Sequence, residues 1–148
     1  MQLTIGQLAK SAGVKLTTIR FYERRGLIPE PHRAASGYRQ YTSDMVTRIH
    51  FIKNAQAIGF TLEEISELLE LKENTNTHCK TIKARAAHKI ELVDNKIQVL
   101  KTIKRALQDL HDGCRGHGSI QEGCTILDAL GSEKITQQFM SSAMGAWL

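Results

Sequence analysis

The residues of this chain best suited to chemistry are its three cysteines, Cys79, Cys114 and Cys124. Three thiols cannot all pair within one chain, and the reducing cytosol keeps thiols free. This usage predicts metal binding or redox sensing in preference to a disulfide framework. Thiolates select soft ions, namely Hg(II), Cd(II), Pb(II), Cu(I) and Zn(II), over hard ions that prefer oxygen ligands.

The segment between Cys79 and Cys114 predicts one long helix. Apolar residues recur there at steps of three and four, no Pro or Gly interrupts residues 79–112, and Gly113 is placed to end the helix. Such a helix spans roughly 50 Å, so Cys79 and Cys114 of one straight chain cannot share an ion. The stripe comprises Ile82, Ala86, Ile90, Val93, Ile97, Leu100, Ile103, Leu107 and Leu110.

An antiparallel partner helix would bury this stripe and bring Cys79 of one subunit to Cys114 of the other. We therefore predict a homodimer joined by an antiparallel coiled coil, with two thiolate sites between subunits. The alternative is a helix packed on its own domain, with three unrelated buried thiols. Three thiolates suit trigonal Hg(II) or Pb(II), whereas Zn(II) prefers four ligands. The candidates for a fourth ligand are His117, which could instead be a solvated loop residue, and His78.

The net charge of +5 is concentrated in the N-terminal third of the 148 residues. Residues 1–55 carry nine Lys and Arg against three acids, a balance of +6, and the remainder carries eleven against twelve, a balance of −1. This distribution predicts a surface for a polyanion such as double-stranded DNA. The sequence has no run of about 18 apolar residues and no charged-then-apolar leader, so we expect a cytoplasmic protein without a membrane partner.

The first 26 residues predict a helix-turn-helix. Thr4 can cap a short helix, Gly13 makes a tight turn, and a second helix runs from Lys15 to Arg25 and ends at Gly26. The second helix would read DNA, because short hydroxyls and long cations suit base edges and phosphates. Its expected DNA-binding residues are Lys15, Thr17, Thr18, Arg20 and Arg24.

Residues 33–41 predict a basic, aromatic hairpin with its tip at Ser36 and Gly37. Beside a reading helix such a hairpin is a wing, so we expect Arg33, Tyr38 and Arg39 to bind DNA, the last two at the phosphate backbone. The alternative is a solvated loop with a packing tyrosine.

A second helix pair is predicted over residues 42–71. Thr42 or Ser43 would cap its first helix, which carries Ile58 at the end of its apolar side, and Thr61 and Glu64 form a capping box for the next. Lys53 is a further candidate phosphate contact. We predict a mainly α chain with these parts: a winged helix-turn-helix domain at 1–71, a hinge at 72–78, a dimerisation helix at 79–112, a metal-binding loop and short helix at 113–130, and a tail at 131–148 that is either a short helix on the partner or disordered.

The chain resembles the MerR family of metal- and drug-responsive transcription regulators over residues 1–130. The resemblance is carried by the segments at 3–9, 17–23, 26–29, 37–41 and 58–65, together with Val14, Phe51 and Ile52. It implies a dimer joined by a long antiparallel helix pair, which binds a promoter whose spacer is too long for efficient use by RNA polymerase. Effector binding would reshape the dimer, which then underwinds and bends the DNA.

The resemblance further implies that Cys79 of one subunit joins Cys114 and Cys124 of the other, as in the metal-sensing branch. Residues 77–79 and 87–89 look like the mercury regulators, whereas the step from Cys114 to Cys124 looks like the zinc regulators. Arg115 and Ser119 replace a cysteine and a histidine expected for a two-zinc site. Cu(I) is disfavoured, because copper sensors need no partner thiol. We rank Hg(II) first, followed by Pb(II), Cd(II) and Zn(II).

The sequence bears on three other function classes. An enzyme is disfavoured, because no nucleophile–base pair, phosphate loop or catalytic carboxylate pair can be assembled. A redox-sensing regulator with a switch disulfide between Cys114 and Cys124 is the alternative chemistry. A DNA-compacting structural protein would show no preference for a palindromic site over random duplex.

Overall fold

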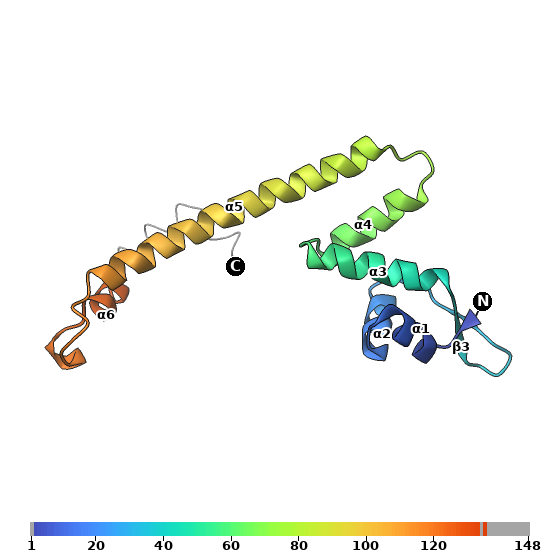
Figure 1. Cartoon of the computed structure of the whole chain (residues 1–148), viewed down its shortest axis with the longest axis horizontal. Helices are drawn as coiled ribbons and strands as arrows, with labels where there is room; N and C mark the ends of the chain where they lie inside the picture. Colours follow the sequence, from blue (N-terminus) through green and yellow to red (C-terminus); the bar gives the residue numbers. More distant parts are fainter. Residues whose placement is uncertain (1, 134, 136–148) are drawn as a thin grey trace. The chain divides into compact units, whose positions relative to one another are not determined.

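The computed structural model describes residues 2–133 and 135, in two compact units, Met1–Arg85 and Ala86–Leu148. Most of the described chain is helical (Figure 1). The first unit contains a head, residues 2–73, followed by the start of the longest helix. The elements of the head are β1 (Gln2–Leu3), α1 (Ile5–Ala12), α2 (Leu16–Arg24), β2 (His32–Arg33), β3 (Arg39–Thr42), α3 (Asp44–Ala57) and α4 (Leu62–Glu73). The remaining elements are α5 (Cys79–Asp112), the 3-10 helix η1 (Ile120–Glu122) and α6 (Thr125–Leu130).

The predicted helix-turn-helix is confirmed in α1 and α2. Thr4 caps α1 in a capping box, in which its hydroxyl accepts from the Gln7 N–H and the Gln7 side chain accepts from the Thr4 N–H. Gly13 ends α1 with φ at +66°, a conformation that favours glycine, and the chain turns directly into α2. The start of α1 and the turn after it are therefore set by Thr4 and Gly13, which the sequence itself assigns to these places.

The predicted wing is confirmed as an antiparallel pair of β2 and β3, in which His32 lies opposite Gln40 and Arg33 opposite Arg39. Strand β1 pairs with the other edge of β3, which gives a three-stranded sheet in the order β1-β3-β2. At the tip, the Ala34 N–H donates to the Tyr38 carbonyl and the Gly37 N–H donates to the Ala34 carbonyl. The sheet thus connects the first residues of the chain to the wing.

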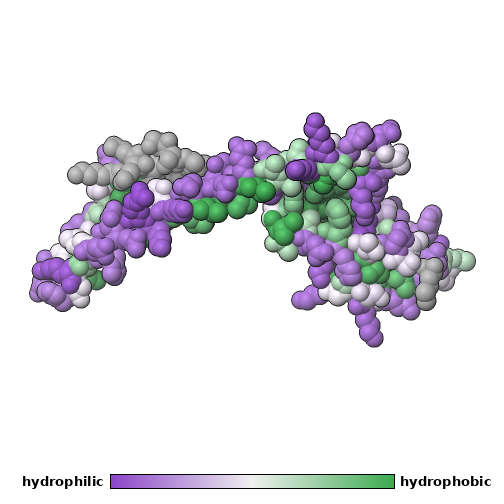
Figure 2. All heavy atoms as spheres, turned by 45° about the horizontal axis from the view of Figure 1, so that its top comes forward, coloured by the Kyte–Doolittle hydropathy of each residue, from purple (hydrophilic) through white to green (hydrophobic). Residues whose placement is uncertain are grey.

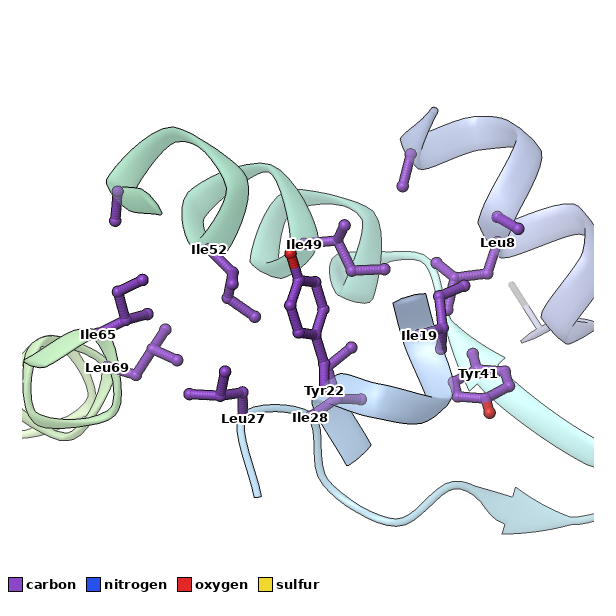
Figure 3. Close-up of a cluster of buried hydrophobic side chains, with 13 residues drawn as sticks. Leu8, Ile19, Tyr22, Leu27, Ile28, Tyr41, Ile49, Ile52, Ile65 and Leu69 are labelled. Atoms are coloured by element: carbon purple, nitrogen blue, oxygen red, sulfur yellow. The ribbon is translucent and has the colours of Figure 1, made fainter. Parts of the chain in front are cut away.

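The core of the head is mainly aliphatic and lies between α1, α2, α3 and α4 (Figure 3). Tyr22 enters this core from α2, and its hydroxyl donates to Gln56 Oε1 at 2.8 Å. One expectation is wrong: Ile58 is 69% exposed, because α3 ends at Ala57 and the chain turns away before Ile58 can reach the core. The buried apolar residues are Leu8, Ala9, Ala12, Ile19, Tyr22, Leu27, Ile28, Tyr41, Ile49, Ile52, Ala55, Ile65 and Leu69.

Helix α4 begins at the predicted capping box, where Thr61 and Glu64 exchange side-chain and backbone hydrogen bonds. It continues to Glu73, two residues beyond the expected end of the domain at residue 71. The expected cap of α3 is only partly correct, because Ser43 occupies the cap position without making a side-chain hydrogen bond. The turn after α4 is short, and the Asn76 N–H donates to Asn74 Oδ1 within it.

Helix α5 is continuous over 34 residues and ends before Gly113, as the sequence predicts. None of its residues is buried. Its apolar stripe is accessible along its length, with Ile90 62% and Leu107 60% exposed, and hydrophobic spheres follow the helix in Figure 2. The expectation for the tail lies outside the described residues, apart from 131–133 and 135.

The core makes a simple stability prediction. Ile49→Ala removes a side chain that is 0% exposed and should lower the free energy of unfolding by about 2–5 kcal/mol, because it leaves a cavity in the head. Ile58→Ala, seven tenths exposed, is the control and should change it by less than about 0.5 kcal/mol. Urea unfolding at one fixed protein concentration measures both. Equal losses for the two variants would contradict this placement of the core.

Candidate nucleic-acid interface and metal centre

The exposed side of α2 carries the cations expected to meet DNA. Lys15, Arg20 and Arg24 are exposed, as is Thr17, while Thr18 is half-buried. Among the described residues, neither Arg20 nor Arg24 makes an intramolecular ion pair or side-chain hydrogen bond. Their charges are therefore available to an external anion.

Lys53 joins this surface from α3. An open hollow beside the start of α2 is lined by Lys15, Thr18, Lys53 and Gln56, together with the turn at Gly13. The Lys53 ammonium donates to the Gly13 carbonyl at 3.3 Å, so the side chain reaches across from α3 to the turn of the helix-turn-helix. The structure thus brings together two of the predicted cations from distant parts of the sequence.

The wing presents its three predicted residues differently. Tyr38 is 75% exposed at the tip. Arg33 is also exposed, and among residues 2–133 its side chain makes one long hydrogen bond, of 3.4 Å, from Nη1 to the Gly37 carbonyl. Arg39 instead donates from Nη1 to Glu23 Oε2 at 2.8 Å. Sequence reasoning missed this partner, because Glu23 lies in the reading helix among exposed cations.

The loop after α5 brings two of the three cysteines to one place. Cys114 and Cys124, both half-buried and both free thiols, line a single hollow of about 150 Å³ together with His117. The ends of the loop are held together, because the Thr125 hydroxyl donates to the Gly113 carbonyl at 3.1 Å. A longer contact of 3.4 Å joins Arg115 Nη2 to the Gly123 carbonyl.

Cys79 is exposed and is the first residue of α5, whereas Cys114 follows the last residue of that helix. One continuous helix therefore separates it from the loop thiols. No group of three or more His, Cys, Asp or Glu residues that could hold a metal ion occurs within the described part of a single chain. His78 adjoins Cys79 and lies at the opposite end of α5 from His117.

A second arginine contact that the sequence did not indicate joins α3 to the segment after α2 and to the end of α4. Arg48 in α3 donates from Nε to the Leu27 carbonyl at 2.6 Å and from Nη1 to Glu73 Oε1 at 2.5 Å. It therefore connects the chain after α2 with the last residue of α4. No residue pattern marks this contact, because its partners lie 21 and 25 positions away.

No helix in the described ranges combines the length and hydropathy needed to cross a membrane. A winged helix-turn-helix with a basic second helix, followed by a long helix and a loop lined by two thiols, is the architecture of a DNA-binding protein.

Comparison with known families supports this class. Residues 3–72 match the MerR HTH family regulatory protein model, and residues 46–110 match the model described as MerR, DNA binding. A mercuric resistance operon regulatory protein of Bacillus cereus is 45% identical over 88% of this chain and 98% of its own length. The chain belongs to the MerR family, whose members are DNA-binding transcription regulators that work as dimers and are not enzymes.

Two solved structures of metal complexes share this fold. The regulator PbrR691 from Ralstonia metallidurans, in complex with lead(II), is 35% identical with a TM-score of 0.78, over 86% of this chain and 98% of that one. The dual-function regulator MerR from Bacillus megaterium, in complex with a mercury(II) ion, is 41% identical with a TM-score of 0.66, over 88% and 100%. Metal-responsive relatives thus span most of the chain, and nothing in the comparisons favours the redox alternative.

The free charge of Arg20 makes a quantitative prediction. Arg20→Gln should weaken binding to duplex DNA and lower the slope of log affinity against log salt by about 0.9, because one fewer counterion is released. Lys101→Gln removes the same charge from α5 and should leave the slope unchanged. Fluorescence anisotropy across a salt series measures both. An unchanged slope for Arg20→Gln would show that this side chain does not meet a phosphate.

Proposed function

We propose that this protein is a dimeric regulator that senses Hg(II) and activates a metal-resistance promoter. The observation that carries the proposal is the division of its thiols. Cys114 and Cys124 line one hollow, and Cys79 stands at the other end of a 34-residue helix that buries none of its residues. Pairing two such helices in antiparallel sense covers both stripes and completes each three-thiol site from two subunits.

The donor set fits a soft ion. Two half-buried thiols in one hollow, with a third supplied by the partner, give sulfur ligands that Hg(II), Pb(II) and Cd(II) favour over oxygen. An ion bound there would tie the two subunits together through metal–sulfur bonds. His117 lines the same hollow and is the candidate for a fourth ligand if the ion is Zn(II). His78 is the second candidate, beside the partner's Cys79 in an antiparallel pair.

The relatives support mercury as the first choice and lead as the second. The Bacillus cereus relative carries mercuric resistance in its name, and the Bacillus megaterium structure holds mercury(II) at 41% identity. The lead(II) complex has the higher TM-score, at 35% identity. Cd(II) follows on ligand chemistry alone, whereas Zn(II) also has a homologue among the relatives, the regulator ZntR of Escherichia coli.

At the promoter, the two heads of the dimer would each read one half-site with α2, Lys53 and the wing. Metal capture at the ends of the coiled coil changes how the heads are held, and the bound DNA is underwound and bent. RNA polymerase then meets promoter elements that are aligned. Activation by DNA shape requires no new base contact in the metal-bound state.

The head offers a route for this coupling. Arg48 ties Leu27, just after the reading helix, to Glu73, just before the turn that leads to Cys79. On the other side of the turn, Arg85 Nη1 of α5 donates to Glu67 Oε2 of α4 at 2.5 Å. These contacts link the start of α5 to the reading helix through α4, so a shift in α5 reaches α2.

Mixed dimers test whether the site is shared between subunits. Cys79→Ser and Cys114→Ser homodimers should each fail to retain Hg(II) in thiol-buffered equilibrium dialysis. A heterodimer of the two variants should retain one ion, because Cys79 of one subunit meets Cys114 and Cys124 of the other at one of its two ends. A heterodimer that retains none would overturn the shared site.

His117→Ala is the matched control, and for Hg(II) it should keep one ion per subunit, because three thiolates suffice. Promoter transcription is then titrated against Hg(II), Pb(II), Cd(II), Zn(II) and Cu(I). Activation by Zn(II) at a lower free concentration than Hg(II) would overturn the proposed ion while leaving the dimeric sensor in place. A reversible Cys114–Cys124 bond under peroxide, with no metal retained, would favour redox sensing.

The coupling route makes a separate prediction. Glu73→Gln removes the charged partner of Arg48 and should lower the metal-dependent rise in transcription by roughly two- to thirtyfold, as expected for a residue in a coupled network. Hg(II) uptake should be unchanged, because the thiols are untouched. Glu70→Gln removes the same charge from α4 without removing the ion pair between Arg48 and Glu73, and it should leave the response intact. Equal effects of the two variants would show that charge, and not this contact, matters.

A further inference from the structure

A carboxylate stands within the basic reading helix. Residues 1–55 contain three acids, Glu23, Glu30 and Asp44, and Glu23 lies in α2 between exposed cations. A negative charge beside a polyanion opposes binding. The Glu23 side chain is nevertheless only 12% exposed, so it is turned into the head and not toward solvent. The repulsion that this carboxylate adds to DNA binding therefore calls for a compensating structural role of Glu23.

Both carboxylate oxygens of Glu23 are used by the wing. Oε2 accepts from Arg39 Nη1 at 2.8 Å, and Oε1 accepts from the Tyr41 hydroxyl. Arg39 and Tyr41 are two residues apart in β3, so they lie on the same face of the strand. One side chain of α2 thus holds two adjacent same-face positions of the wing strand.

Tyr41 makes this attachment rigid. It is 2% exposed, belongs to the core, and lies opposite Leu3 in β1. Burial and the hydrogen bond to Glu23 raise the pKa of Tyr41 to about 12, so the phenol stays protonated and donates at neutral pH. The wing is therefore fixed to α2 by a buried ring, a hydrogen bond and an ion pair.

We propose that Glu23 is a positioning residue for DNA binding, which fixes the wing against the reading helix through Arg39 and Tyr41. Arg39 pairs with Glu23 and does not contact a DNA phosphate, contrary to its expected role. The wing's contact with the backbone falls to Tyr38 and Arg33, which the structure leaves accessible. This inference rests on the DNA-binding part of the proposed function.

The test uses the full-length metal-free dimer and a duplex that it selects from a random library. Glu23→Gln and Arg39→Gln should each weaken DNA binding by about tenfold. The double variant should bind DNA as tightly as the weaker-binding of the two single variants, because both substitutions remove the same ion pair. For Arg39→Gln, the slope of log affinity against log salt should stay within about 0.3 of the slope of the unsubstituted protein. If Arg39 bound a phosphate, the slope would fall by about 0.9 and Glu23→Gln would bind equally or more tightly. That pattern would overturn the inference.

Two controls separate charge from position. Glu30→Gln removes an acid from the same region without losing either hydrogen bond, and its affinity should be unchanged or slightly higher. Arg33→Gln should lower the salt slope by about 0.9, because this arginine is expected at a phosphate. A loss of affinity in Glu30→Gln equal to that in Glu23→Gln would overturn the positioning role.

Hydrogen exchange gives a readout that is independent of DNA. In Glu23→Gln, amides in residues 32–42 should exchange faster, while those in α1 and α4 keep their rates.

Tyr41→Phe is the second variant, to be used if Glu23→Gln unfolds the head. It removes only the hydroxyl and should bind DNA about threefold more weakly with an unchanged salt slope. An unchanged DNA affinity of Tyr41→Phe would overturn the inference. If no duplex is selected, the proposed DNA function fails as well, whereas the other contrary results count against the wing contact alone.

Discussion

The exposed apolar stripe of α5 is the constraint on which the rest of the molecule depends. A helix draws most of its stability from packing an apolar face, and α5 buries none of its 34 residues. A second copy has a stripe of the same spacing, and the family works as dimers. The same antiparallel pairing that would cover this stripe would also bring Cys79 to the loop thiols of the other subunit. In the proposed dimer, the stability of α5 and the completion of the metal site would then depend on one packing event.

Pairing of two α5 helices would not by itself position the loop thiols or the elements of the head. Contacts within the loop and within the head do so. In the loop, the hydroxyl of Thr125 holds the chain ends close, so Cys114 and Cys124 share a hollow within one subunit. In the head, Glu23 and Arg48 each connect elements far apart in sequence, one toward the wing and one toward α4. Hydrogen bonds and ion pairs of these polar side chains therefore hold the expected DNA-binding surface in place and connect it with α4, the helix that precedes α5.

The sequence predicted the elements whose signals are local. The capping boxes at Thr4 and Thr61 and the uninterrupted period of α5 depend only on near neighbours, and each is found as expected. Ile58 is the exception, because the apolar spacing continues one residue past the end of α3 and gives no sign that the helix has ended. The ion pair of Arg39 could not be predicted, because charge alone does not show that a carboxylate 16 residues earlier will face it.

The division of cysteines between the two ends of α5 has a genetic consequence. A cell with one intact and one damaged copy of the gene would assemble mixed dimers as well as pure ones, since in the proposed dimer all subunits pair through the same stripe. A subunit lacking Cys114 would spoil one end of every mixed dimer while its own Cys79 still served the other. Loss of a single thiol would therefore be partly dominant, and two different defective alleles could complement each other within one dimer.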